Sequence, residues 1–475
     1  RKQRKEAPDD ARIRRFEDRI SEGKFYLSLS STKNDPRLMQ ALRGRLNESA
    51  EALGKNVAKD SELRRDVYEK MKALERSLAK AKRMQQEEEC FSSKKLHASI
   101  VSTESQLRST RKQASYLTQL AAKTIPRGLH CLALRLSTEY FALNSSRRNI
   151  RNEPPKVDDD DDRLLFHYAL FSDNVLAAAV VVNSTVTHAK DPWKHVFHVV
   201  TDGLNYGSMK MWFLSNPPGR ARIDVANVED LAWLNASYSP VLRQLTSRKT
   251  IDYYYYGTHD RGARADPNAK YRNPKYLSIM NHLRFYLPEI FPELDKILFL
   301  DDDVVVQKDL TPLWSVDLNG KVVGAVETCG EKFHRFDHYL NFSNPLIAKS
   351  FDPRACGWAF GMNVFDLREW RRQNITRIYH RWQELNEERL LWKLGTLPPG
   401  LLTFWNRSFA LEKSWHVLGL GYDAKTSTRD IERAAVIHYN GNAKPWLEIG
   451  IAKFRSYWTK YVDYDQRYLR DCNVT

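Results

Sequence analysis

The sequence predicts an α/β protein with a sheet of the nucleotide-binding type, preceded by a region of helices. Three observations predict this class. From residue 164 onward, apolar runs of strand length alternate with helical patterns, as in β-α-β units. The run KILFLDDDVVV, residues 296–306, carries three consecutive carboxylates after a buried strand pattern. Residues 1–125 are instead rich in charged residues, Gln, Ser and Ala, which is typical of exposed helices.

Residues 1–125 are predicted to form a helical stem. Between residues 64 and 89, apolar side chains recur at intervals of three and four, which makes one apolar stripe on a charged helix. The members of this stripe are Val67, Met71, Leu74, Leu78 and Ala81. Residues 96–122 repeat the pattern, and Pro126 and Gly128 are expected to end that helix. Both stripes need a partner to become buried.

Residues 126–162 are interpreted as a linker and wrap-around segment. They contain Pro154, Pro155 and five consecutive aspartates at 158–162. An acidic run of this kind is far more often a solvated loop than a metal site.

Residues 163–475 are predicted to form the α/β domain. Strands are expected at 164–172, 195–202, 222–225 and 322–327, with helices at 173–183, 206–214 and 277–287. Ser172 or Asp173 is the expected N-cap of the first helix, and Pro288 is expected to halt the last. No GxGxxG follows the first strand and no Walker motif occurs, so the dinucleotide fingerprint is absent.

The formal net charge of +16 and the pI of about 9.4 suggest a polyanionic partner. Nucleic acid, an acidic lipid surface and an acidic polysaccharide all satisfy this charge. The sequence has no zinc finger, RNA-recognition signature or basic zipper, so we expect no nucleic-acid partner. No run of about 18 apolar residues occurs. The chain begins without Met at RKQRKE, a basic start that suits the flank of a preceding membrane anchor and equally suits a solvated tail.

Sequons and cysteines point to the secretory pathway. Eight Asn-X-Ser/Thr sequons occur, and they are acceptors only in that pathway. They begin at Asn47, Asn144, Asn183, Asn235, Asn341, Asn374, Asn406 and Asn473. Five cysteines allow two disulfides and one free thiol. The expected pairs are Cys329 with Cys356 and Cys131 with Cys472, which leaves Cys90 for an interchain bond; the alternative is five reduced thiols.

The acidic strand end is the candidate functional site. Alternation places Asp301 and Asp303 on one side and Asp302 on the other. Neighbouring carboxylates repel each other unless a cation lies between them, and oxygen ligands favour Mg²⁺ or Mn²⁺. The alternative is a strand end that carries solvated acids. The best third ligand is His438 in AVIHYNGNAKPW, residues 435–446, although a lone His at a strand end is usually structural.

The loop after His438 suits a phosphate. Gly441 permits a close approach of the backbone, and Lys444 can meet a phosphate as a point charge.

Several motifs together resemble one enzyme family. LDDDVVV at 300–306 and HYNGNAKPW at 438–446 resemble the DxD and HxxGxxKP signature of the retaining glycosyltransferases of family eight, the group that includes glycogenin. Other segments resemble the plant galacturonosyltransferases that build pectic homogalacturonan. These segments are 124–136, 275–292, 356–370, 391–405 and 415–423. The resemblance covers about residues 120–475, and the stem fits it more loosely.

The resemblance implies a GT-A fold with a Rossmann-like mixed sheet, in a Golgi lumen behind a single N-terminal anchor (a type II membrane protein). It implies transfer of galacturonic acid from UDP-galacturonate to an α-1,4-linked oligogalacturonide, with retention and with Mn²⁺, or Mg²⁺ in its place. The implied metal ligands are Asp301, Asp303 and His438. The implied UDP-sugar-binding residues are Ser172, Asp173, Asn174, Asp302, Gly441 and Lys444. Arg284 matches a basic residue beside the diphosphate and donor sugar, and Glu327 a carboxylate near that sugar.

The chain departs from the wider family in a segment that lies near the anomeric carbon of the donor sugar in relatives. Relatives place a polar Gln or Asp where this chain reads GTLPPGLLTF, residues 395–404. The NAG motif of some relatives is AFG here, at 359–361. No nucleophile can therefore be named, and departure and return on the same face of the sugar is the expected course. Asn363 and Asp366 lie nearby and are interpreted as structural.

An acidic acceptor requires a basic groove. The segment 259–275 supplies candidates just before the helix of Arg284, and Tyr253–Tyr256 could stack on sugar rings. These candidates are Arg261, Arg264, Lys270, Arg272 and Lys275. An ordinary solvated loop is an equal alternative. Arg368, Arg371 and Arg372 form a second basic patch.

Two other functions remain open at this point. The chain could be a catalytically silent subunit that anchors an active partner through its stem and Cys90. It could also be the same enzyme acting on another UDP-sugar, since a few pocket contacts decide the donor. The stem is the expected site of homo- or hetero-oligomer formation.

Overall fold

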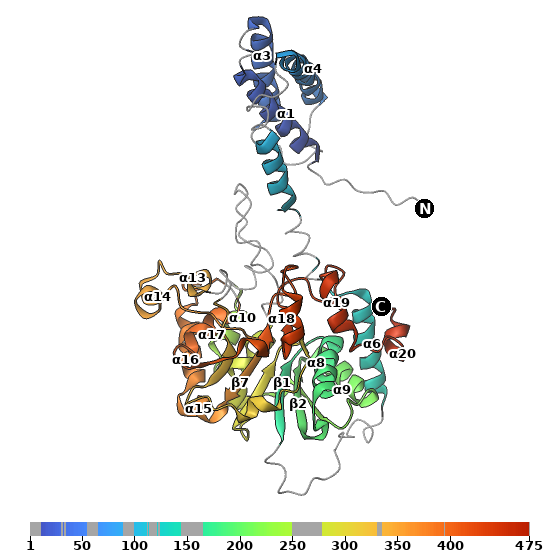
Figure 1. Cartoon of the computed structure of the whole chain (residues 1–475), viewed down its shortest axis with the longest axis vertical. Helices are drawn as coiled ribbons and strands as arrows, with labels where there is room; N and C mark the ends of the chain where they lie inside the picture. Colours follow the sequence, from blue (N-terminus) through green and yellow to red (C-terminus); the bar gives the residue numbers. More distant parts are fainter. Residues whose placement is uncertain are drawn as a thin grey trace. The chain divides into compact units, whose positions relative to one another are not determined.

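The computed structural model describes residues 11–29, 32, 35–54, 65–88, 99–111, 113, 121, 124–143, 165–248, 278–329, 335–393 and 395–474. The chain divides into two compact units, an N-terminal unit of residues 1–114 and a C-terminal unit of residues 115–475 (Figure 1). Each unit has its own hydrophobic core. No helix in the described ranges is long and apolar enough to cross a membrane.

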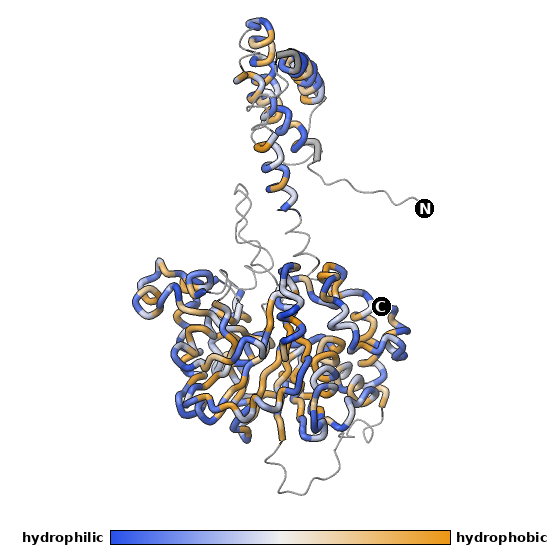
Figure 2. The backbone as a smooth tube through the Cα atoms, in the orientation of Figure 1, coloured by the Kyte–Doolittle hydropathy of each residue, from blue (hydrophilic) through white to orange (hydrophobic). Residues whose placement is uncertain are grey.

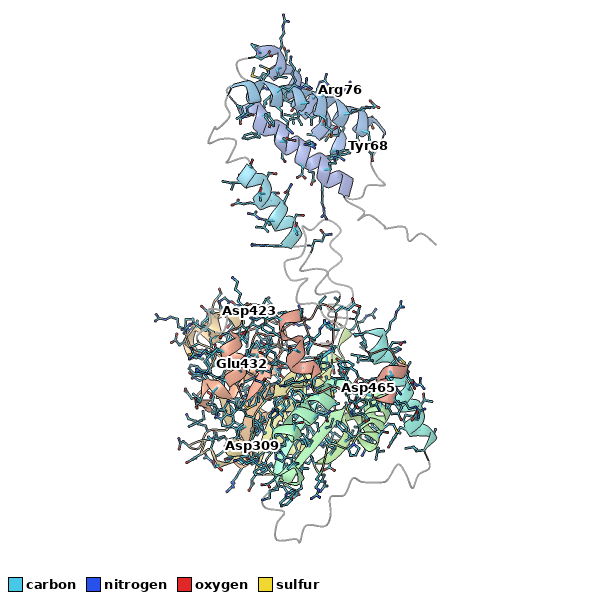
Figure 3. All side chains as sticks on the ribbon, turned by 45° about the vertical axis from the view of Figure 1, so that its right-hand side comes forward. Tyr68, Arg76, Asp309, Asp423, Glu432 and Asp465 are labelled. Carbon is cyan, nitrogen blue, oxygen red and sulfur yellow. A yellow bond between two sulfur atoms is a disulfide. The ribbon has the colours of Figure 1, made fainter. Side chains whose placement is uncertain are left out.

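Three helices build the core of the N-terminal unit. They are α1 (Ala11–Ser28), α3 (Pro36–Leu53) and α4 (Arg65–Glu88). The stripe predicted on α4 is buried, with Leu74 fully inaccessible. Figure 3 labels Tyr68 and Arg76 on α4, and the Tyr68 ring meets Phe16 of α1 edge-on at 5.4 Å between centroids. The helical stem predicted from the sequence is therefore a small bundle in the described ranges.

The start of α3 shows how the sequence sets a helix boundary. The side chain of Asp35 accepts hydrogen bonds from the backbone N–H groups of Arg37 and Leu38, and Pro36 occupies the first helical turn. Residues 99–111 are also helical, as the second stem pattern predicts. Their large apolar side chains Ile100, Val101 and Leu107 are 48%, 51% and 47% exposed.

A seven-stranded mixed sheet forms the centre of the C-terminal unit, in the order β3-β2-β1-β4-β7-β6-β8. Strands β3, β2, β1 and β4 are parallel, and β7 is antiparallel to both β4 and β6. Figure 2 shows hydrophobic residues concentrated along these central strands. The bounds are β1 Phe166–Phe171, β2 His195–Thr201, β3 Arg222–Asn227, β4 Lys296–Leu300, β6 Val323–Val326, β7 Met362–Asp366 and β8 Ser408–Leu411.

The acidic run does not continue as one strand. A second sheet, in the order β5-β10-β9, contains β5 (Val304–Val306), β10 (Val436–His438) and β9 (His416–Val417). The strand predicted from the apolar run before the acids is β4, and a turn at 301–303 joins it to β5, which belongs to a different sheet. That turn places the three acids between the two sheets.

Helices cover both faces of the large sheet. On one face, α6 (Arg127–Ala142), α8 (Val175–His188) and α9 (Gly203–Ser215) pack on side chains such as Tyr168 and Leu298. On the other face, α15 (Leu367–Arg372), α16 (Ile375–Leu385) and α17 (Leu397–Thr403) pack on Phe299 and Phe365 (Figure 1). The parallel strands therefore have both faces buried, as their continuous apolar sequences require.

Three helix boundaries differ from the sequence predictions. Pro126 directly precedes the first residue of α6, which includes Gly128, because proline suits a helix start as well as a stop. The predicted helix at 277–287 is a 3-10 helix (Ile279–Phe285) followed by the short α12 (Leu287–Ile290), and Pro288 lies in the first turn of α12. The N-cap of α8 is Asn174, whose side chain accepts from Leu176 N–H and Ala177 N–H.

A disulfide joins α6 to the C-terminal end of the chain. Cys131 of α6 bonds Cys472, which directly follows α20 (Arg467–Asp471). The segment 126–162 thus begins with a helix that packs in the C-terminal unit, while residues 144–164 lie outside the described ranges.

Candidate active site

The three acids lie in a turn that hydrogen bonds hold at both ends. The turn begins at the carboxyl end of β4, the edge where open α/β sheets bind their ligands. Asp301 N–H donates to the carbonyl oxygen of Gly361 at 2.9 Å, and Tyr439 N–H donates to the carbonyl oxygen of Asp303 at 2.9 Å. The backbone of the turn is therefore tied to β7 and to β10.

His438 reaches the acids because β10 pairs with β5. In that antiparallel register His438 lies opposite Val304, the residue after Asp303. His438 Nε2 lies 2.8 Å from Asp303 Oδ1 and 3.9 Å from Asp301 Oδ2. Ligand atoms of Asp301, Asp303 and His438 all lie within 4.8 Å of one another. The structure thus brings together the three residues for which the sequence predicts metal binding.

Two further residues position the His438 ring. His416 of β9 stacks on it, with 5.1 Å between centroids and 15° between planes, and its Nε2 lies 3.2 Å from His438 Nδ1. Gly361 has φ +104°, and a Cβ placed there would lie 2.4 Å from His438 Cε1. Only glycine leaves room for the ring, so His416 and Gly361 together define where His438 points.

Two basic side chains contact the same acids. Arg284 donates to Asp301 Oδ1 at 2.7 Å, and Lys444 makes a short ion pair with Asp303 Oδ2. The guanidinium of Arg284 lies between the rings of Phe299 and Phe360, 4.6 and 4.7 Å from their centroids. Arg284 is only 8% exposed. Its position is therefore fixed by aromatic packing as well as by charge.

The electrostatics of the turn follow from burial and from these partners. Burial alone would raise the pKa of Asp303, but His438 and Lys444 outweigh it and hold that pKa well below its ordinary value. Burial would lower the pKa of Lys444, and the charge of Asp303 raises it instead. Burial, together with the charges of Asp303 and Asp173, raises the pKa of Asp302 to about 7. Asp303 is therefore held in its ionised form.

Asp302 points to the end of β1 and away from the metal group. The hydroxyl of Ser172 donates to Asp302 Oδ2 at 2.7 Å, and the N–H of Asn174 donates to the Ser172 oxygen at 3.0 Å. The side chain of Asn174 caps α8, and Asp173 is exposed beside it. The ends of β1 and β4 are thus linked through Ser172, which places the predicted uridine-contacting residues next to the acidic turn.

Gly441, which is expected from the sequence to approach a phosphate, lies close to the backbone of Gly421. It has φ +105°, and a Cβ there would lie 2.8 Å from the carbonyl oxygen of Gly421. Ala443 N–H donates to the same oxygen at 2.9 Å. The loop that delivers Lys444 is therefore packed against residues 419–422.

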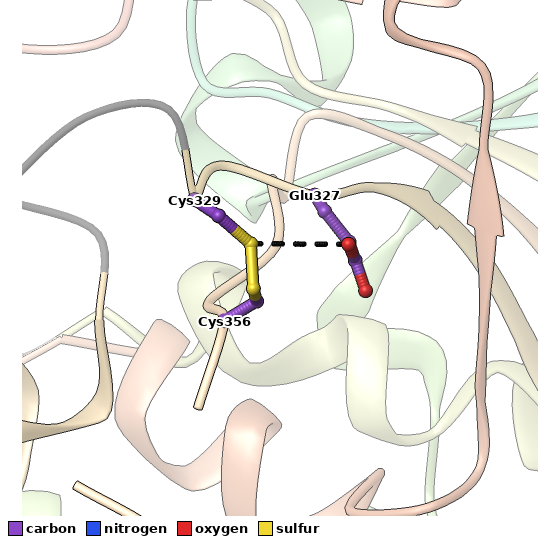
Figure 4. Close-up of side chains that lie close together, drawn as sticks. All are labelled: Glu327, Cys329 and Cys356. Carbon is purple, nitrogen blue, oxygen red and sulfur yellow. Dashed lines mark hydrogen bonds between the residues drawn. A yellow bond between two sulfur atoms is a disulfide. The ribbon is translucent and has the colours of Figure 1, made fainter. Parts of the chain in front are cut away.

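Glu327 lies at the same sheet edge, beside a disulfide (Figure 4). It follows β6, which runs parallel to β4 with β7 between them, so strand spacing puts it roughly 10 Å from the acidic turn. Cys329 bonds Cys356, and the Cys329 sulfur lies 3.8 Å from Glu327 Oε2. Because both sulfurs are used in the disulfide, this cluster offers no thiolate to a metal.

Other predicted residues fall into two groups. The acceptor candidates lie outside the described ranges, as do Cys90, Asn144 and Tyr253–Tyr256. They are Arg261, Arg264, Lys270, Arg272 and Lys275. Six sequon asparagines are exposed: Asn47, Asn235, Asn341, Asn374, Asn406 and Asn473. Asn183 is half-buried in α8, and its amide donates to the carbonyl oxygen of Tyr461 at 3.4 Å.

The residues near the predicted departure from the family are structural in their contacts. Asn363 is fully buried and donates to the carbonyl oxygen of Ala359 at 2.8 Å. Asp366 caps α15 by accepting from Glu369 N–H. Arg371 and Arg368 of the second basic patch pair with Asp295. None of these contacts involves the acidic turn.

The donor set fits a divalent cation. Two carboxylates and one imidazole suit Mn²⁺ or Mg²⁺ bound together with phosphate. Asp301 Oδ2 faces His438, while the other oxygen of Asp301 is held by Arg284. His438 also has the partner on its second ring nitrogen that ligand imidazoles usually have.

A mixed α/β sheet, with an Asp-Asp-His group and two basic side chains at its ligand-binding edge, defines a glycosyltransferase of the GT-A class. The chain belongs to glycosyltransferase family 8. The sequence model "Glycosyl transferase family 8" matches residues 131–450, and "Galacturonosyltransferase domain 1" matches residues 9–86. The resemblance that the motifs indicate is therefore confirmed, and so is the fold class. The chain is an enzyme of the kind that moves a sugar from a nucleotide-sugar to a glycan.

Two plant relatives support the same family. The chain is 62% identical to "Probable galacturonosyltransferase 4" of Arabidopsis thaliana over 98% of this chain and 74% of the relative. It is 47% identical to "Probable galacturonosyltransferase 9" of the same plant, over 95% of this chain and 79% of the relative. A solved galactosyltransferase, LgtC in complex with donor and acceptor sugar analogues, matches 65% of this chain and 100% of its own, with 19% identity and a TM-score of 0.44.

Proposed function

We propose that this glycosyltransferase moves galacturonic acid from UDP-galacturonate onto the end of an α-1,4-linked oligogalacturonide, with retention and with Mn²⁺, or Mg²⁺ in its place. The observation that supports this proposal most directly is that ligand atoms of Asp301, Asp303 and His438 lie within 4.8 Å of one another at the carboxyl end of β4. Relatives named as galacturonosyltransferases over nearly the whole chain support the choice of sugar.

Each residue of the site has a part in this proposal. Asp301, Asp303 and His438 would hold the divalent ion, which neutralises charge on the diphosphate as UDP leaves. Lys444 and Arg284 add positive charge close to that diphosphate. Each is expected to supply on the order of 2–4 kcal/mol of transition-state stabilisation, as other fixed electrostatic donors do.

Arg284 also suits the carboxylate of the donor sugar. Its planar guanidinium can contact two acceptors at once, and Phe299 and Phe360 hold its plane in place. Glu327 would face the sugar from the end of β6. Ser172, Asp173 and Asn174 at the end of β1 would contact the uridine, with Asp302 behind them.

The anomeric configuration is expected to be retained without a covalent intermediate. The segment 395–404 contains no carboxylate, so it offers no candidate nucleophile. Departure of UDP and attack of the acceptor on the same face therefore fit this chain best.

The acceptor is a polyanion, and residues 259–275 would form the basic groove that holds it. The exposed sequons and the two disulfides suit a Golgi lumen, behind an N-terminal anchor of a type II membrane protein. The helical stem would join this chain to related subunits. These assignments make the enzyme part of the synthesis of pectin, a polysaccharide of the cell wall.

The test is release of UDP from a panel of UDP-sugars, with and without Mn²⁺ and an oligogalacturonide. We expect turnover only with UDP-galacturonate, acceptor and metal together, and an α-linked product by NMR. Asp301→Asn should abolish transfer, whereas Asp337→Asn, an exposed acid of α13 (Phe336–Tyr339), should leave it unchanged. Turnover with a different donor would replace the sugar assignment. Inactivity with every donor would favour the silent, anchoring subunit.

A further inference from the structure

We infer that Lys444 is the counter-ion that Asp303 exchanges for the divalent ion, so that the ion and the diphosphate enter the site as a unit. This inference rests on the proposed function. It adds to it that binding of the divalent ion and binding of the diphosphate are coupled through Lys444. Lys444 then has two positions, one on Asp303 and one on the diphosphate.

The oxygen atoms of the two acids show where an exchange has to occur. Asp303 uses both of its oxygens, Oδ1 toward His438 Nε2 at 2.8 Å and Oδ2 toward Lys444. Asp301 uses only Oδ1 for Arg284, and its Oδ2 lies 3.9 Å from His438 Nε2. A divalent ion can therefore meet Asp301 Oδ2 without breaking the ion pair with Arg284. To bind Asp303 it enters between Oδ1 and His438 Nε2, and the ammonium group of Lys444, on Oδ2 of the same carboxylate, then lies beside the ion.

The two basic side chains differ in their freedom to move. Arg284 is held between Phe299 and Phe360 and is nearly buried. Lys444 is held through its ammonium group by Asp303 and by the carbonyl oxygen of Tyr439 at 3.1 Å. Its unbranched four-carbon stem has several rotatable bonds through which the ammonium group can turn to a new acceptor. Lys444 is thus the side chain that leaves, and Arg284 the one that stays.

The charge balance makes metal and nucleotide binding depend on each other. Two carboxylates already face two basic side chains, so a divalent ion alone adds uncompensated positive charge to a mostly buried group. Like charges a few ångströms apart repel enough to change an affinity tenfold at protein dielectric constants. A diphosphate supplies the missing negative charge and a new acceptor for Lys444. Each ligand therefore strengthens the binding of the other, as linkage requires.

The test uses Mn²⁺ binding to the full chain, measured from the electron paramagnetic resonance signal of free Mn²⁺, without nucleotide and with saturating UDP. Lys444→Met keeps the length of the side chain and removes its charge. We expect it to bind Mn²⁺ alone at least tenfold more tightly than the wild type, and UDP in the presence of Mn²⁺ at least tenfold more weakly.

Two matched variants separate this role from general effects of charge. Lys444→Arg keeps the charge and should remain within about threefold of the wild type for Mn²⁺ alone. Lys453→Met removes a charge from the same C-terminal region, where Lys453 contacts the carbonyl oxygen of Thr426, and should change neither affinity.

Lys444→Met should raise the affinity for Mn²⁺ alone and lower the affinity for UDP, and this pair of opposite changes distinguishes the exchange from a general effect of charge. If Lys444→Met binds Mn²⁺ alone no more tightly than the wild type, the exchange is refuted, even when the wild type transfers sugar normally. If the wild type takes up no Mn²⁺ with or without UDP and transfers no sugar, the proposed function fails as well.

Discussion

Replacing Gly361 by Ala should disable the metal group without touching any ligand residue. Gly361 contacts two ligands at once: its carbonyl oxygen accepts from Asp301 N–H, and its Cα faces the ring of His438. A Cβ there would lie 2.4 Å from Cε1 and 2.6 Å from Nδ1 of that ring. The ring would have to retreat by about 1 Å to reach ordinary van der Waals separation.

A displacement of this size is large for a metal ligand. Metal-ligand distances tolerate only about 0.2 Å, so His438 would be lost as a well-placed ligand. Loss of ligand orientation typically lowers metal affinity by 10–100-fold, which corresponds to roughly 1.4–2.8 kcal/mol. We therefore expect Gly361→Ala to weaken Mn²⁺ binding, measured with UDP present, by at least tenfold.

The control has to carry the same backbone strain. Gly320 also has a positive φ, +71°, but a Cβ there would meet no atom within 4 Å. Gly320→Ala should cost about 1–2 kcal/mol in the free energy of unfolding, as left-handed alanine does, and leave Mn²⁺ affinity unchanged. Equal Mn²⁺ affinity in Gly361→Ala and the wild type would refute the reasoning, and so would an equal loss in both variants.

Two further predictions concern stability. His195 is fully buried, no described residue gives either ring nitrogen a hydrogen bond, and burial lowers its pKa to about 4. The unfolded chain therefore takes up a proton near pH 6.5 that the folded chain refuses, and stability falls as the pH drops from 6.5 toward 4. His195→Phe should recover about 2 kcal/mol at pH 5 and next to nothing at pH 7.5 in urea unfolding, and an equal effect at both pH values would contradict this. Removing the disulfide with Cys131→Ala and Cys472→Ala should lower the free energy of unfolding by roughly 3–5 kcal/mol, because the bond closes a loop with a sequence separation of 341. An unchanged urea midpoint under oxidising conditions would show that the bond does not form in solution.

Local patterns in the sequence identify much of the C-terminal unit. An apolar run that ends in acids locates the carboxyl end of β4, and alternating apolar segments locate β1, β2 and β3. The same patterns do not reveal that the β-branched run after the acids, residues 304–306, leaves the large sheet. Which sheet β5 joins depends on β10, far along the chain, and no local pattern encodes that pairing.

Proline shows a second limit of local patterns. Pro126 and Pro288 were expected to end helices, and both lie at helix starts. Proline lacks a backbone N–H and has a fixed φ, and both properties are compatible with the end of a helix and with its start. Whether the helix lies before or after the proline therefore depends on which segment packs against the rest of the fold. For α6 the deciding contacts are with α9 and α20, which are remote in sequence.

The residues that support the site carry little local signal in the sequence. His416, Phe299 and Phe360 lie in ordinary apolar or mixed segments, and only the folded chain brings them to His438 and Arg284. Gly361 offered a weak signal, since a glycine directly before a buried strand often marks close packing. Residues 249–277 lie outside the described ranges, so the acceptor groove stays a prediction.

The bond between Cys131 and Cys472 turns most of the C-terminal unit into a covalent ring. A protease that cuts once anywhere between these two residues would open the ring without releasing a fragment. Such a nicked chain would migrate as one band on a denaturing gel and separate into two only after a reducing agent is added. Damage during purification would thus be invisible on a non-reducing gel, and a tag attached after Thr475 would remain tethered to α6 even when the chain between them is broken.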